Sequence, residues 1–269
     1  MIRNLQDQIL KLKKEKDIAI LAHSYQSPEI LEIADLKGDS FQLSKAAATL
    51  PNRTVILCGV RFMADTVKIL SPEKTVILPA PQATCPMAEQ IRPEEVLAYK
   101  KAHPGHKVMA YINTTTELKA VCDICVTSSS AEKIVSRIPE TDILFIPDQN
   151  LGAYIQQKVP GKRITFMNGC CPVHNEVTVR HVQEARAAWP DAKLLVHPEC
   201  PKEVAALADM VGSRFRHHRL CAAIRLRLHH RHGKEHRRLP SLVKPERNFP
   251  VLPGSDLPGH ETNQPDGRL

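Results

Sequence analysis

The sequence lacks several features that would assign it to a class directly. No apolar run is long enough to cross a membrane, and the N-terminal stretch MIRNLQDQILKLKKEKD has no apolar core of a signal peptide. Eight cysteines without a secretory leader argue against a disulfide scaffold. These absences predict a soluble cytoplasmic protein with no membrane partner, whose thiols are buried, bound to metal or catalytic.

Common nucleotide and metal fingerprints are also missing. The chain has no P-loop, no GxGxxG and no EF-hand loop. It has one CxxC, within VCDIC at 121–125, and no second one to complete a zinc site. This motif fits a redox pair or half of a zinc site, but its apolar surroundings favour buried structural thiols at Cys122 and Cys125.

Positive charge is confined to one end of the chain. Residues 214–269 carry 12 Lys and Arg against 5 Asp and Glu, whereas residues 1–213 carry 25 against 24. A basic arm of this kind could bind nucleic acid, and its histidines could bind metal. The near-neutral body carries no such signal, and it is there that a function must be sought.

The body of the chain alternates short apolar segments with amphipathic ones. Its start predicts a helix with Ile2, Leu5, Ile9 and Leu12 turned inward. Strands that alternate with helices form parallel sheets covered on both faces, so we expect an α/β fold with its site where strands end. The predicted strands are 17–23, 53–60, 74–81, 107–113, 142–148, 163–169 and 192–199.

Polar residues stand at five of these strand ends, which favours a single shared site. They are AH at 22–23, YIN at 111–113, PDQN at 147–150, NGCC at 168–171 and HPEC at 197–200. In an extended segment His197 and Glu199 point the same way, as an acid–base pair would. GDS at 38–40 and TSSSA at 127–131 precede helices, where they can bind an anion or simply cap the helix.

Two cysteines stand in matching contexts. Cys85 and Cys171 each precede a proline and lie 86 residues apart, which suggests an internal repeat of about that length. Taken alone, each fits an iron–sulfur or zinc ligand, or a free buried thiol.

Seven ordered motifs resemble the quinolinate synthase family, and the resemblance covers residues 1–213. They are AHSYQ, IADLKGDSFQLS, CGVRFMADT, YINTTTELKA, TSSSA, NGCCPVH and HPECPKEVAALADMVGS. The resemblance implies three similar α/β/α domains with pseudo-threefold symmetry, each donating one Cys to a [4Fe-4S] cluster that acts as a Lewis acid. It also implies condensation of iminosuccinate with dihydroxyacetone phosphate to form quinolinate in NAD biosynthesis, with iminosuccinate supplied by an aspartate oxidase or dehydrogenase.

The same resemblance assigns residues and domains. Cys85 and Cys171 match the first two cluster ligands, and Tyr25, His197 and Glu199 match catalytic positions. Substrate-binding positions fall on His23, Ser40, Tyr111, Ile112, Asn113, Ser128, His174, His197, Pro198 and Glu199. The expected domains are 1–84 and 85–170, then the start of a third at 171–213, and an aberrant, disordered tail at 214–269.

The tail departs from the family, because the third cluster Cys is missing after Ser213. Read from the second base of suitable codons, residues 229–239 and 254–261 can encode the family words containing GTE and CPDMK. The hidden Cys codon falls at 257–258, about 86 residues beyond Cys171. We therefore predict a frameshift near codon 213, a truncated third domain, and poor cluster binding and reduced activity in the chain as written.

Two alternatives of other classes stay open on the residues alone. One is a non-enzymatic α/β protein that binds nucleic acid through its tail. The other is a zinc enzyme that uses Cys and His of the same cavity.

Overall fold

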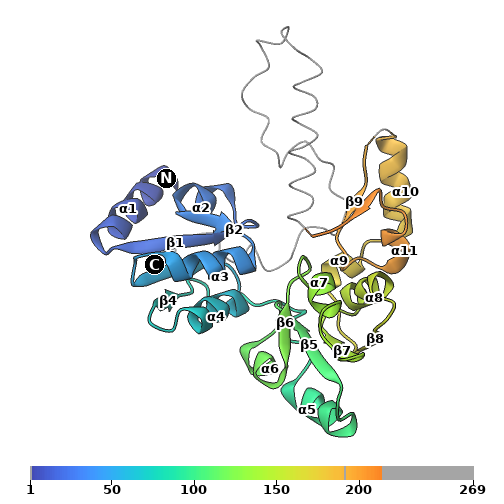
Figure 1. The fold of residues 1–269 in the computed structure, drawn as a ribbon. Coiled ribbons are helices and arrows are strands. Elements are labelled where there is room, and N and C mark those ends of the chain that lie inside the picture. Colours follow the sequence, from blue (N-terminus) through green and yellow to red (C-terminus); the bar gives the residue numbers. More distant parts are fainter. Residues whose placement is uncertain (1, 191, 214–269) are drawn as a thin grey trace.

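The computed structural model describes residues 2–190 and 192–213, so the predictions for residues 214–269 lie outside the described residues. Within that part, three sheets follow one another along the chain, and every strand pair is parallel (Figure 1). The predicted α/β class is confirmed. No helix in the described part is long and apolar enough to span a membrane.

The first two sheets have the same strand order. One runs β2-β1-β3-β4 and the other β6-β5-β7-β8, and a third, two-stranded sheet runs β10-β9. The strands of the first sheet are β1 (Ile18–His23), β2 (Leu36–Gly38), β3 (Thr54–Cys58) and β4 (Thr75–Ile77). Those of the other two are β5 (Lys107–Tyr111), β6 (Ile124–Val126), β7 (Asp142–Ile146), β8 (Arg163–Phe166), β9 (Leu195–Val196) and β10 (Met210–Val211).

Helices connect the strands and pack on the sheets (Figure 1). They are α1 (Ile2–Glu15), α2 (Pro28–Ile33), α3 (Ser40–Thr49), α4 (Arg61–Leu70), α5 (Pro93–Ala102), α6 (Thr116–Val121), α7 (Ala131–Val135), α8 (Gln149–Lys158), α9 (Pro172–Asn175), α10 (Val179–Ala188) and α11 (Lys202–Ala205). The expected inward face of α1 is wrong. Ile2, Leu5 and Leu12 are exposed, Ile9 is half-buried and no residue of the helix is fully buried, because α1 packs along one side, against α2 and β1.

The second sheet shows why continuous apolar runs predict buried strands. Alternate residues of β5 and β7 enter two different cores, so Met109 and Phe145 lie on one face and Val108 and Leu144 on the other. All four are fully buried, as expected for a parallel sheet covered on both sides. The core containing Met109 also includes Cys171 and packs against Cys85, so it brings the two cysteine loops to one place.

One local device is repeated in all three sheets. In each, an aspartate just before a short strand accepts the backbone N–H of a residue in or beside the neighbouring strand. Asp35 accepts from Ile20 at 2.7 Å, Asp123 from Val108 at 2.8 Å and Asp209 from Leu194 at 2.9 Å. The strand register is also the same, pairing His23 with Gly38 and Tyr111 with Val126, while Val196, just before His197, pairs with Val211. His23, Tyr111 and His197 therefore occupy equivalent positions at the carboxyl ends of three strands.

Candidate functional site

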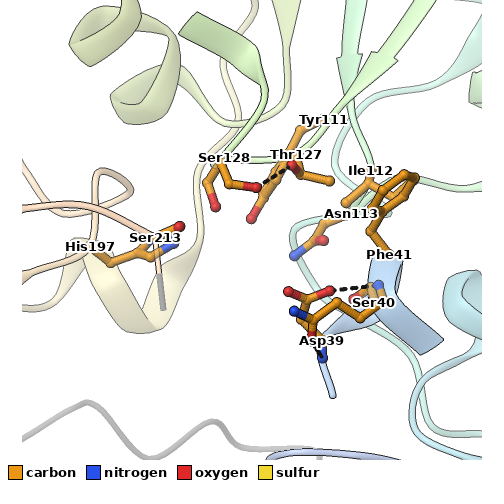
Figure 2. A pocket seen from close by; sticks show the side chains of 12 residues that line it. Asp39, Ser40, Phe41, Tyr111, Ile112, Asn113, Thr127, Ser128, His197 and Ser213 are labelled. Atoms are coloured by element: carbon orange, nitrogen blue, oxygen red, sulfur yellow. Dashed lines mark hydrogen bonds between the residues drawn. The ribbon is translucent and has the colours of Figure 1, made fainter. Parts of the chain in front are cut away.

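A pocket of about 220 Å³ lies where these strand ends converge. Figure 2 shows side chains from three parts of the chain facing one space: the start of α3, the loops after β5 and β6, and the ends of β9 and β10. This is the edge at which parallel α/β sheets bind ligands. Its lining residues are Asp39, Ser40, Phe41, Gln42, Tyr111, Ile112, Asn113, Thr127, Ser128, Ser129, His197 and Ser213.

Two rigid turns present hydroxyl groups to the pocket. Asp39 caps α3 by accepting the Gln42 N–H at 2.8 Å, which fixes Ser40 at the first turn of a ten-residue helix. After β6, the Thr127 hydroxyl lies 2.9 Å from that of Ser129, and the Thr127 N–H donates to Ser130 Oγ at 2.9 Å. Hydroxyls and helix N–H groups held in this way suit an anionic ligand.

A buried carboxylate between two imidazoles lies beside the pocket. Glu199 Oε2 is 3.1 Å from His174 Nδ1, and Glu199 Oε1 is 3.5 Å from His197 Nδ1. Burial alone would raise the pKa of Glu199, but His197, His174 and the Tyr111 hydroxyl lower it well below its usual range. Burial alone would lower the pKa of His174, but its contacts with Cys171 and Glu199 raise this pKa to about 10.

The two predicted metal ligands lie on loops that share one core. Cys171 is buried and Cys85 half-buried, and burial raises the pKa of both thiols. Ligand atoms of Cys171, His174 and Glu199 all lie within 4.8 Å of one another, a grouping that could hold a metal ion. Because metal binding displaces the thiol proton, these sites favour a strongly thiophilic metal.

The remaining predicted residues do not line the pocket. The buried His23 ring is 4.7 Å from Tyr25, whose N–H donates to His23 Nδ1 at 3.4 Å. Glu199 N–H makes the same contact to His197 Nδ1 at 3.3 Å, so the two strand ends share a local geometry. Pro198 lies between His197 and Glu199, outside the lining set.

Sequence reasoning missed three lining residues, Phe41, Gln42 and Ser213. Phe41 carries no chemical signal, whereas Gln42 could have been recognised as the third residue of a capping box beginning at Asp39. The expectation for the CxxC motif is wrong for Cys125, which is exposed on β6, while Cys122 is half-buried and donates to the Leu118 carbonyl. Cys125 is exposed because it lies on the short edge strand of its sheet.

The fold and the site define an α/β protein with a pocket lined by hydroxyl, amide and imidazole groups, beside a buried thiol–imidazole–carboxylate group. Residues 7–224 match the family described as quinolinate synthetase A protein, so the chain belongs to that family. It is 50% identical over 213 residues to the quinolinate synthase of Clostridium acetobutylicum, covering 79% of this chain and 70% of the relative. The chain is also similar to the quinolinate synthase of Clostridioides difficile, with 47% identity covering 79% of this chain and 70% of the relative. For the quinolinate synthase of Aquifex aeolicus the identity is 45%, covering 79% of this chain and 66% of the relative.

Proposed function

We propose that this chain is a quinolinate synthase, which condenses iminosuccinate with dihydroxyacetone phosphate and releases water and phosphate. The observation that carries the proposal is the pocket of Ser40, Ser128 and His197 beside the buried Glu199. Relatives of that name at 45–50% identity support it. The reaction needs iminosuccinate from an aspartate oxidase or dehydrogenase.

The pocket residues have roles that follow from substrate charge. A dicarboxylate and a phosphoester need donors that are not themselves anions. Ser40, Tyr111, Asn113 and Ser128 offer hydroxyl or amide groups at the pocket wall, and His197 offers an imidazole. The other substrate-binding positions in the proposal are His23, Ile112, His174, Pro198 and Glu199.

Successive dehydrations require protons to be taken up and released at fixed points. Glu199 contacts both His174 and His197, so its carboxyl group can exchange a proton with either imidazole. His197 contacts the Glu199 carboxylate and also lines the pocket. It is therefore the group that can pass a proton between Glu199 and a substrate in the pocket. We assign Tyr25 to the same proton-transfer set.

The cysteine loops fit a [4Fe-4S] cluster. Cys85 and Cys171 would hold it, since both thiols adjoin one apolar core and thiolates are the ligands that such clusters use. When bound, the cluster would supply a Lewis-acidic iron to the substrate oxygen atoms. The Cys171–His174–Glu199 group also suits zinc, and metal analysis separates the two, because zinc protein is colourless and iron–sulfur protein is brown.

We further propose three similar domains related by pseudo-threefold symmetry, at 1–84, 85–170 and 171–213. The shared strand order of the first two sheets and the repeated aspartate contact support this division. The third would be truncated by the frameshift after Ser213, which removes the third cluster Cys.

The test is quinolinate formation after anaerobic reconstitution with iron and sulfide. Two chains are compared: the chain as written, and one whose reading frame is shifted by one base after codon 213. We expect the shifted chain to be brown and to form quinolinate, and the written chain to form little. Absence of quinolinate from a brown, shifted chain would refute the proposed function.

A further inference from the structure

The start of α8 touches two loops that carry the site. The fully buried Asp148 accepts the Cys171 N–H at 2.7 Å and the Leu151 N–H at 2.8 Å. Two residues on, Asn150 Nδ2 donates to the Glu199 carbonyl at 3.0 Å and to Asn175 Oδ1 at 3.1 Å. One helix end thus holds the backbone of both Cys171 and Glu199, and Figure 1 shows α8 beside α9 and α11.

The first sheet supplies an internal comparison. There α4 follows β3 as α8 follows β7, and the Arg61 N–H donates to the Ala83 carbonyl at 2.9 Å. The Gln149 N–H makes the equivalent bond to Gly169 at 2.8 Å. Yet α4 begins after Val60, whose side chain accepts no hydrogen bond. Starting a helix at this place therefore does not require Asp148.

The bond from Asp148 to Cys171 also goes beyond capping. A cap needs only one side-chain oxygen that accepts an N–H of its own helix. Asp148 meets this need by accepting the Leu151 N–H. The second carboxylate oxygen accepts the N–H of Cys171, which lies 23 residues further along the chain and directly precedes α9. His174, on α9, then faces Glu199, whose carbonyl is bound by Asn150. These contacts connect α8 to Cys171, His174 to Glu199, and Glu199 back to α8 through Asn150.

We propose that Asp148 and Asn150 are positioning residues, which fix the Cys171 loop and the His197–Glu199 loop to a single helix end. They set the spacing of thiol, imidazole and carboxylate without touching substrate. The inference rests on the proposed function for the role of Cys171 as a cluster ligand. Its test needs neither the cluster nor enzyme activity, so the positioning role and the proposed function can fail separately.

The chain carries its own probes for this test. Cys171 reports on one loop, the buried Cys200 directly after Glu199 reports on the other, and Cys85 is the reference. The full-length, reduced, metal-free chain is treated with iodoacetamide, and alkylation of each cysteine is followed by mass spectrometry. Asp148→Asn and Asn150→Ala are compared with Thr178→Ala, which removes the N-cap of α10.

We expect Asp148→Asn to speed alkylation of Cys171 by about tenfold, because it disrupts a hydrogen bond between the Cys171 N–H and a fully buried carboxyl group. Asn150→Ala should speed alkylation of Cys200, and neither variant should change Cys85. Thr178→Ala should leave all three rates unchanged. If Asp148→Asn does not fold, Asn150→Ala carries the test through Cys200, since Asn150 is only half-buried. Unchanged rates, or rates that rise together at all three cysteines, would overturn the proposal.

Discussion

At the scale of single residues, the site is organised around a carboxylate removed from water. Glu199 is 3% exposed and has imidazoles on two sides, and these contacts lower its pKa despite burial. The Tyr111 hydroxyl contributes a third stabilising contact from a different sheet. Residues of the second and third sheets therefore act on one proton-binding group.

Tyr111→Phe tests this arrangement. The ring stays, so the buried packing of Tyr111 is kept, but the hydroxyl that stabilises the Glu199 carboxylate is lost. In the chain with the shifted reading frame, we expect quinolinate formation to fall by about tenfold, because one hydrogen bond to the charged Glu199 is lost. Thermal unfolding checks that the melting temperature changes little. Unchanged turnover would show that the hydroxyl has no part in the reaction.

Chemistry-bearing residues were predictable from the sequence where they follow an apolar strand. His23, Tyr111 and His197 stand at the ends of such strands, and the structure places them at equivalent positions. The contact of Asp148 with Cys171 was not predictable, because it joins residues 23 apart across separate loops. Sequence places PDQN at a strand end, but only the fold shows what Asp148 touches.

At the scale of helices and strands, a glycine allows α8 to lie close to its sheet. A Cβ at Gly152 would come within 2.7 Å of the Phe166 ring and 3.1 Å of Phe145. The helix that carries Asp148 and Asn150 is thus seated by a close backbone contact with β7 and β8.

We therefore expect Gly152→Ala to destabilise the fold by about 1–3 kcal/mol through overpacking. Gly161→Ala is the matched control, because nothing lies within 4 Å of a Cβ at that position. Urea unfolding of both variants measures the difference. Equal midpoints would mean that Phe166 moves aside without cost.

The stability of the fold depends on pH through Asp123, one of the three aspartates that bind a neighbouring strand. Burial acts to raise the pKa of Asp123, but hydrogen bonds from Lys100 and the Val108 N–H lower it below the ordinary value of 3.8. Because the folded-state pKa is lowered, this group stabilises the fold above pH 3.8 and loses its effect as pH falls through the folded-state value.

Asp123→Asn should accordingly cost about 1–2 kcal/mol at pH 7, with the deficit shrinking below pH 4. Urea unfolding at pH 7 and below pH 4 measures this deficit, with Asp7→Asn on the exposed face of α1 as the control. A deficit that stays constant across the range would contradict the assigned role of the charge.

Strands within longer apolar segments were predictable, including the short β4 and β9, whereas β2, β6 and β10 were not. β1, β3, β5 and β7 are apolar runs of five or six residues, long enough to read from composition. β2, β6 and β10 have two or three residues, too few to show a period. They form because an aspartate binds the adjacent strand, which is a tertiary contact.

At the scale of the whole molecule, the pocket depends on all three sheets. The start of α3 supplies Ser40, the loops after β5 and β6 supply Asn113 and Ser128, and His197 and Ser213 come from the third sheet. The equivalent residues His23, Tyr111 and His197 lie 88 and 86 residues apart, close to the 86 residues between Cys85 and Cys171. The meeting of their strand ends required the structure, because strand periodicity does not determine how one sheet faces another.

The most direct measurement is calorimetric titration of quinolinate into the full-length chain and two serine variants. Ser128→Ala removes a hydroxyl from the pocket wall, and Ser136→Ala removes an exposed one at the end of α7, where it bonds only within its own turn. If the pocket binds the dicarboxylate, Ser128→Ala should weaken the affinity about tenfold and Ser136→Ala should leave it unchanged. Equal affinities in all three chains would show that the product binds elsewhere, and the site described here would be wrong.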